Sequence, residues 1–221
     1  MVAIAAASLF GSVPIMAQVT VGTSGPYGNC IPFGCASLFG PRYQQIYDAA
    51  AFSGPLSITA LSFFCTNKDC NQSAVFGTES YAISLSTTSR SVTGLSAPLS
   101  SNVGPNATSF FSGAFSGMTG SGFTIHGSSF NYNPSSGNLL LDITIIFGTE
   151  TNTYFDAGSD TRISRAYGSE TAPGFGQNSG LLTGFNVLTG NDVGYTVPEP
   201  ASIALIATGL LAIVAVKRRR A

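Results

Sequence analysis

The sequence predicts an all-β domain, a jelly-roll-like β-sandwich, with an N-terminal signal segment and a C-terminal transmembrane helix. Many short stretches alternate apolar and polar residues, as half-buried strands do. Clusters of Gly, Pro, Asn and Ser, such as Asn133–Asn138, separate these stretches and indicate turns. Apart from the two apolar termini, no long stretch has the helical period of 3.6 residues. We therefore divide the chain into residues 1–17, 18–196 and 197–221.

Residues 1–17 are apolar and rich in small side chains, which is typical of a secretory signal peptide cleaved after Ala17. No Lys or Arg precedes the apolar region, so the usual basic segment is missing. The alternative interpretation is a buried N-terminal helix.

The most regular strand pattern covers Asn138–Phe147. Alternate residues make one wholly apolar face, and Asp142 is the only charge on the other face, so we expect a central strand that is partly covered on both sides. Leu56–Phe64 is also a predicted strand. Its apolar residues 56 and 58 share one face with each other, and residues 61 and 63 share one face with each other. The other predicted strands are Arg42–Tyr47, Tyr81–Ser86, Thr108–Phe115, Gly122–Ile125, Thr161–Tyr167 and Leu181–Leu188.

The chain carries little charge, with 9% charged residues and a net charge of −1. Four of its nine Lys and Arg residues stand in the last five positions, so the rest of the chain has five cations against ten Asp and Glu. A nucleic-acid interface needs a basic face, which this composition excludes. Low charge together with 26 glycines and abundant Ser and Thr suits an extracellular β-sandwich.

The four cysteines form two pairs with the same C-x4-C spacing, Cys30 with Cys35 and Cys65 with Cys70. An even number of cysteines in an exported protein predicts disulfides, for which three connectivities exist. We favour the two local bridges, because short spans containing turn residues close easily. A zinc site made of four thiolates is the alternative, although an oxidising compartment argues against it.

The C-terminal segment combines three physical features. Pro198 and Pro200 flank Glu199 and keep the chain extended, because proline fixes φ and has no N–H donor. Residues 201–216 are uncharged, although somewhat short of the roughly 20 apolar residues that span a bilayer. The basic cluster at the end favours the cytoplasmic side, and it comprises Lys217, Arg218, Arg219 and Arg220. A plain membrane anchor after a proline-containing linker is the alternative.

This order of features resembles the PEP-CTERM sorting signal of Gram-negative bacteria. The resemblance rests on Val197, Pro198, Glu199 and Pro200, on the apolar run and on the basic cluster, about the last tenth of the chain. It implies recognition by an exosortase, a membrane-embedded cysteine transpeptidase that removes the helix and basic tail. It also implies a membrane-anchored precursor whose domain is then released or attached at the cell surface, and an association with exopolysaccharide and biofilm production.

Three segments of the middle region also resemble a β-rich domain that recurs among PEP-CTERM proteins. They are Arg42–Phe52, Tyr81–Thr88 and Gly137–Ile143. This resemblance supports the fold and implies no site residues.

Catalytic chemistry has few candidates in this sequence. His126 is the only histidine, no G-x-S-x-G motif is present, and we expect a solvent-facing histidine where a strand runs into a turn. Paired carboxylates for glycoside hydrolysis, or a calcium loop over residues 149–160, are alternatives. The carboxylates concerned are Glu150, Asp156, Asp160 and Glu170. We expect no enzyme and no cofactor.

Tyrosines could instead form a sugar-binding surface, because sugars stack on flat aromatic rings. The candidates are Tyr43, Tyr47, Tyr132, Tyr154 and Tyr167, although most of these rings are expected to pack against the sheets, and the chain has no Trp. The sequence therefore predicts an exported structural or adhesive matrix protein, with a lectin-like carbohydrate-binding module as the alternative.

Overall fold

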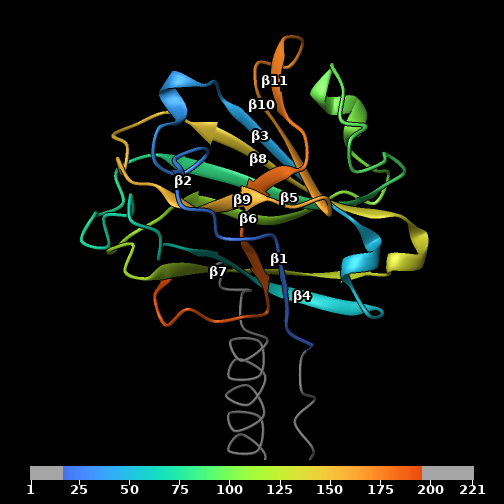
Figure 1. The fold of residues 1–221 in the computed structure, drawn as a ribbon, viewed down its shortest axis with the longest axis horizontal. Coiled ribbons are helices and arrows are strands. Elements are labelled where there is room, and N and C mark those ends of the chain that lie inside the picture. Colours follow the sequence, from blue (N-terminus) through green and yellow to red (C-terminus); the bar gives the residue numbers. More distant parts are fainter. Residues whose placement is uncertain (1–16, 196–221) are drawn as a thin grey trace, which may run out of the picture.

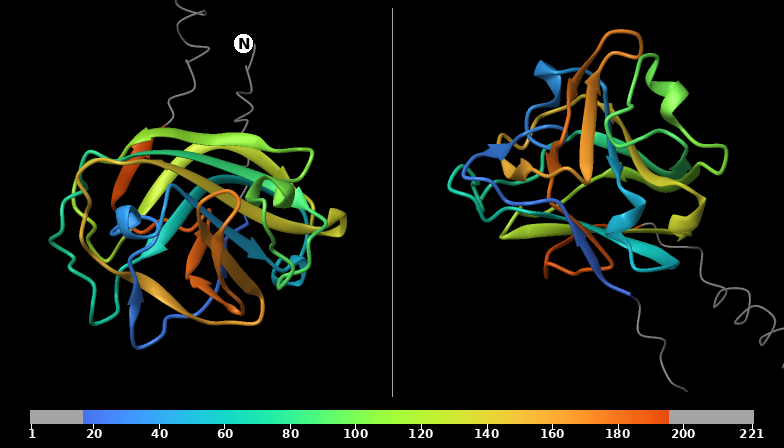
Figure 2. Two further views of the ribbon diagram at one scale, coloured as in Figure 1. Left: turned by 90° about the horizontal axis from the view of Figure 1, so that it is seen from above. Right: turned by 45° about the vertical axis from the view of Figure 1, so that its right-hand side comes forward.

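The computed structural model describes residues 17–195, which are built from β-strands and four 3₁₀-helices of three or four residues. Two large sheets face each other across one core, and a small third sheet contacts both (Figure 1, Figure 2). The prediction of an all-β domain is confirmed. Within residues 17–195 no helix has the length and apolar character to cross a membrane. The predicted transmembrane helix in 197–221, and the predicted signal peptide except Ala17, lie outside the described residues.

The six-stranded sheet is antiparallel, with the order β11-β10-β3-β8-β5-β6. β8 lies in its interior between β3 and β5, as its apolar pattern predicts. Residues 139–143 of β8 are buried on both faces, whereas Thr144 and Ile146 are exposed. The strands in sheet order are Pro173–Gly176, Ile163–Gly168, Arg42–Tyr47, Asn138–Ile146, Ser80–Thr88 and Thr108–Ala114.

The segment between β5 and β6 covers part of the outer face of this sheet. It includes the 3₁₀-helix η3, Leu99–Asn102, whose Leu99 and Asn102 are fully buried. The side chain of Gln44 donates to the carbonyl of Leu99 at 3.0 Å and accepts from Asn102 at 2.9 Å. These bonds satisfy a polar side chain of β3 that would otherwise be buried without a partner.

The five-stranded sheet has the order β1-β13-β4-β7-β14. A β-bulge between Ile58 and Ala60 reverses the side-chain alternation of β4, which explains why its two apolar pairs are out of phase. β14 runs parallel to β7, unlike the strands of a wholly antiparallel jelly roll, and the jelly-roll connectivity stays a prediction. The strands in sheet order are Val19–Val21, Thr183–Phe185, Leu56–Phe64, Gly122–Tyr132 and Asp192–Tyr195.

The small sheet has the order β12-β9-β2 and shows where strand prediction was wrong. The predicted strand Leu181–Leu188 is split, because β12 ends at Leu181 and β13 begins at Thr183 in a different sheet. The N–H of Leu182 donates to the carbonyl of Asp156 at this crossing. β7 also continues well beyond Ile125, its predicted end. The strands of the small sheet are Ser179–Leu181, Phe155–Ser159 and Gly28–Asn29.

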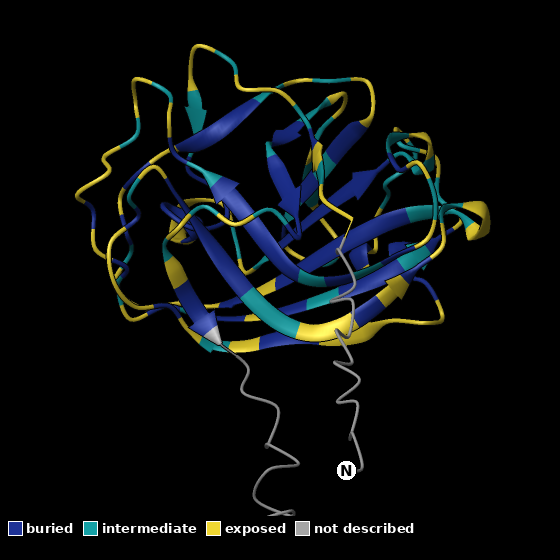
Figure 3. Cartoon of the chain, turned by 90° about the horizontal axis from the view of Figure 1, so that it is seen from below, coloured by how far each residue is buried: buried dark blue, intermediate teal, exposed yellow. Residues whose placement is uncertain are grey.

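Burial is concentrated in the strands, and exposed residues gather in the loops (Figure 3). Two groups of side chains inside the sandwich differ in chemistry. The aromatic cluster contains Phe33, Phe63, Phe76, Tyr81, Phe115, Phe123 and Phe155. The polar cluster contains Tyr43, Gln45, Tyr47, Arg165 and Thr183.

Candidate functional site

The predicted sorting residues Val197, Pro198, Glu199 and Pro200, and the basic cluster Lys217–Arg220, lie outside the described residues. The described chain leads to them through β14, whose Tyr195 pairs with His126 of β7. At the other end, Ala17 and His126 line one pocket on the five-stranded sheet. Both ends of the described chain therefore leave the domain at the same sheet (Figure 1).

The structure pairs Cys30 with Cys35 and Cys65 with Cys70, which is the local connectivity that the spacing favours. The Cα–Cα distances are 5.3 Å and 5.4 Å, within the usual range for disulfides. Each of the four sulfur atoms is bonded to another in one of these two disulfides, so none is a thiolate for the alternative zinc site.

The first disulfide loop inserts Phe33 into the aromatic cluster. This ring is fully buried and contacts five other rings at centroid distances of 4.7–5.8 Å. The arrangements are mostly edge-to-face or tilted, as the quadrupoles of aromatic rings prefer. A loop that would otherwise lie on the surface is thereby held by the core.

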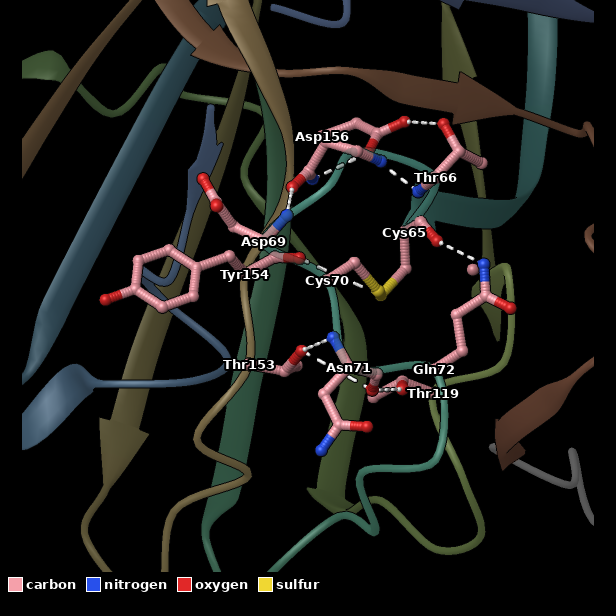
Figure 4. The surroundings of a disulfide bond; sticks show 12 residues. Cys65, Thr66, Asp69, Cys70, Asn71, Gln72, Thr119, Thr153, Tyr154 and Asp156 are labelled. Atoms are coloured by element: carbon pink, nitrogen blue, oxygen red, sulfur yellow. Dashed lines mark hydrogen bonds between the residues drawn. A yellow bond between two sulfur atoms is a disulfide. The ribbon is translucent and has the colours of Figure 1, made fainter. Parts of the chain in front are cut away.

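The irregular segment 151–154 runs between the two disulfide loops. The N–H of Asn152 donates to the carbonyl of Gly34 at 3.1 Å, and the hydroxyl of Thr153 accepts from the N–H of Asn71 at 2.8 Å. A Cβ atom at Gly34 would stand 2.1 Å from the carbonyl oxygen of Thr153, so only glycine permits this approach. Figure 4 shows the second loop and its contacts with this segment.

Asp156 holds the second disulfide loop from β9 (Figure 4). Its carboxylate accepts from the backbone N–H groups of Thr66 and Asn67, both at 2.8 Å, and from the side chains of the same two residues. Burial alone would raise the pKa of Asp156, but these hydrogen bonds outweigh it and lower the pKa below the ordinary 3.8. The carboxylate is an organising group for the loop.

The other predicted carboxylates are engaged by separate partners. Glu150 accepts from the N–H of Ser37 at 2.7 Å, and Asp160 pairs with Arg162 at 2.6 Å. Glu170 accepts from the N–H of Ser100 and pairs with Arg42. These groups are not brought together as a catalytic pair or as a calcium loop. Among residues 17–195 no three His, Cys, Asp or Glu side chains are grouped so that they could hold a metal ion.

His126 lies within β7, where the sequence predicted the end of a strand. Its Nε2 is 3.0 Å from Oδ1 of Asp192 on β14, so this pair links the two parallel strands. The expectation of a histidine at a turn was wrong, because the strand continues for six residues beyond it to Tyr132.

The predicted tyrosines divide by burial. Tyr43, Tyr47 and Tyr132 are buried in the sandwich, as expected for packing residues, whereas Tyr154 is 45% exposed. Tyr167 is partly buried and packs against the core. The exposed ring that the sequence interpretation missed is Tyr27, beside the second disulfide loop.

Sequence reasoning also missed Arg165, on β10. It shares the inner face of its strand with Ile163 and Tyr167, a position at which the alternation could have flagged a charge. Its Nε and Nη1 atoms are buried and make no hydrogen bond within the described structure. Burial raises the pKa of nearby Tyr43 to about 12, and the positive charge of Arg165 opposes this shift.

Comparison with protein-family models finds a match at the C-terminal end of the chain. Residues 196–220 match the PEP-CTERM protein-sorting motif, and the match does not extend into the described β-rich domain. No curated protein and no solved structure matches the chain. The motif that the sequence resembled is therefore present, and it marks the chain as an exported protein that is sorted by an exosortase.

Proposed function

We propose that the β-rich domain is a non-enzymatic structural or adhesive component of the cell surface or extracellular matrix of a Gram-negative bacterium, associated with exopolysaccharide and biofilm. The observation that carries this proposal is the sorting motif at residues 196–220. The two disulfides support it, because they persist in oxidising compartments outside the cytoplasm. The precursor would be held in the membrane by its C-terminal helix until the exosortase cleaves it.

Cell fractionation tests this proposal in the host and in an exosortase deletion. We expect wild-type cells to carry a mature protein without Lys217–Arg220 in the surface or extracellular fraction. The deletion strain should retain the full-length chain in the membrane fraction, and Pro198→Ala with Glu199→Ala should do the same. Mass spectrometry of the C-terminal peptide reads the cleavage.

A matched control is Pro105→Ala, which removes an exposed proline outside the motif in the sequence and should leave sorting unchanged. Mature protein that still carried Arg220 and stayed in the cytosol would refute the proposal. Unaltered biofilm in a strain lacking the whole chain would refute the matrix role alone.

Carbohydrate binding is the second candidate, and a specific site favours it. Arg165 lines a pocket whose rim includes the exposed ring of Tyr27. An aromatic face beside polar groups is the arrangement that binds sugars in an exported domain.

A further inference from the structure

The pocket beside Arg165 lies between the small sheet and strand β10. It has a volume of about 290 Å³, near the lower limit of roughly 300–1,000 Å³ for small-molecule sites. The chain segments that line it belong to residues 25–29, 157–159 and 179–180, together with Arg165. The pocket is therefore suited to one small ligand or one unit of a polymer.

The described residues that line this pocket include one cation, Arg165, and no carboxylate. Among the described residues no Asp or Glu lines it, and Arg165 forms no salt bridge. Arg42 and Arg162, by contrast, each pair with a carboxylate. Nε and Nη1 of Arg165 are buried, so a ligand anion would meet the remaining amino group of this guanidinium through a charge-assisted hydrogen bond.

Neighbouring residues limit the space around Arg165. Its guanidinium carbon lies 5.7 Å from the centre of the Tyr167 ring, and a Cβ atom at Gly176 would approach its Nε to 2.8 Å. Gln45, its cross-strand partner, is fixed by bonds of 2.8 Å and 2.9 Å to the backbone of Leu181. A side chain that is already ordered loses less entropy when a ligand binds.

An exposed aromatic ring, Tyr27, lies at the rim of the pocket, and a second cation, Lys68, lies against that ring. Tyr27 is 66% exposed, and Nζ of Lys68 lies 4.2 Å from the centre of its ring. Lys68 stands inside the second disulfide loop, and the neighbouring carboxylate of Asp69 accepts from the N–H of Gly28 at 3.3 Å. The disulfide loop thus places the cation of Lys68 against the ring of Tyr27, and its Asp69 carboxylate is engaged by the backbone of Gly28. Ser159 and Ser179 add polar groups to its lining.

We propose that this pocket binds a carboxylate-bearing sugar, a uronic acid or a uronic acid unit of a polysaccharide. The carboxylate would pair with Arg165, and the sugar ring would lie against Tyr27. The proposal deepens the surface role given above, since it names the chemistry that an adhesive domain would recognise. A neutral sugar would lack the ion pair, and an inorganic anion would lack the ring contact.

Calorimetric titration of the full-length protein in mild detergent tests the proposal. The probes are glucuronate, galacturonate, glucose and inorganic phosphate. We expect a uronate to bind at least about tenfold more tightly than glucose or phosphate, because a charge-assisted bond contributes more than a neutral one. Equal affinity for glucose or for phosphate, or no uronate binding at all, would overturn the assignment.

Variants locate the site. Arg165→Gln should weaken uronate binding about 10- to 100-fold, and Arg165→Lys should weaken it less because the charge remains. Arg90→Gln is the matched control: Arg90 is half-buried, its guanidinium bonds to Ser101 and it does not line the pocket, so the substitution should leave binding unchanged. If Arg165→Gln does not fold, Tyr27→Ala at the exposed rim should still lower affinity severalfold. Uronate binding that survives both Arg165→Lys and Tyr27→Ala unchanged would refute the site.

This titration is independent of sorting, because it measures purified protein. Failed binding by a protein that fractionates to the surface would refute the pocket alone, and binding by a protein that stays in the cytosol would refute the surface role alone.

Discussion

The aromatic cluster and the polar cluster occupy the same sandwich but are held in different ways. In the aromatic cluster, Phe123 is fully buried and contacts rings from two strands and from the first disulfide loop. In the polar cluster, Gln45 and Tyr47 are equally buried, and hydrogen bonds to Leu181 and Thr183 satisfy them. Apolar burial needs only contact, whereas polar burial needs a partner for every group.

The difference indicates where stability and where binding reside. Buried rings stabilise the fold through the area they remove from water. The polar cluster includes Arg165, a partly buried charge that pairs with no carboxylate in residues 17–195, so we expect it to contribute little to stability. Substitutions that separate the two effects test this comparison.

The largest effect is expected in the aromatic cluster. Phe123→Ala should lower the free energy of unfolding by about 3–5 kcal/mol, because it leaves a cavity among rings that cannot collapse. Phe175→Ala is the control, since its ring is 46% exposed, and it should change stability by about 0.5 kcal/mol or less. Denaturant unfolding can be followed by tyrosine fluorescence because the chain has no Trp. A loss below about 1 kcal/mol at Phe123 would contradict the dominance of ring packing.

A smaller loss is expected at Asp156, which joins the small sheet to the second disulfide loop. Asp156→Asn should cost about 2–3 kcal/mol at pH 7, because an amide presents N–H groups to donors that now face a carboxylate. Asp48→Asn is the control and should cost about 0.5 kcal/mol or less, because Asn keeps the oxygen that accepts from the N–H of Ala50 and caps a helix as well as Asp does.

The pH dependence of the Asp156 effect has a definite sign. Hydrogen bonds lower the pKa of this carboxyl in the folded state, so its stabilisation is complete above the ordinary pKa and is lost as pH falls through the folded value. The difference in the free energy of unfolding between wild type and Asp156→Asn should therefore become smaller below about pH 4. If this difference stayed constant down to pH 2, the charge of Asp156 would not contribute to stability.

The smallest effect on stability is expected at Arg165. Arg165→Met should change the free energy of unfolding by about 1 kcal/mol or less, or increase stability, because it removes a charge that has no ion-pair partner. Arg42→Met should cost about 2 kcal/mol, since it leaves the buried carboxylate of Asp142 unpaired. Thermal and denaturant unfolding compare the two variants. Equal losses would show that Arg165 is a structural cation like Arg42.

Strand positions were largely predictable from the sequence because the period of two is local. Arg42–Tyr47 and Leu56–Phe64 are strands with the predicted bounds. Prediction failed where tertiary structure divides a regular pattern: the two halves of Leu181–Leu188 join different sheets. The short strands β2 and β9 were missed, since two to five residues give too weak a pattern.

The candidate sites were predictable to different degrees. The sorting motif is contiguous, and the cysteine pairs lie five residues apart, so short-range spacing was enough. The four carboxylates predicted as candidates in residues 149–170 each bind different partners, and no local sequence pattern could have revealed those partners. In the sequence, the only sign of Arg165 was a charged residue on the strand face that it shares with Ile163 and Tyr167.

The sequence by itself determined that this chain is exported, is sorted by an exosortase and folds into strands, because each of these depends on residues close together along the chain. Only the tertiary structure decided that Phe33 packs inside the aromatic cluster and that Asp156 binds the second disulfide loop. It also decided that Arg165 and Tyr27 line the same pocket. Those arrangements join residues far apart in sequence, as Gln45 and Leu181 are joined across 136 positions. Alternation assigns a side chain to a face of its sheet, but the packing of distant segments decides what it meets there.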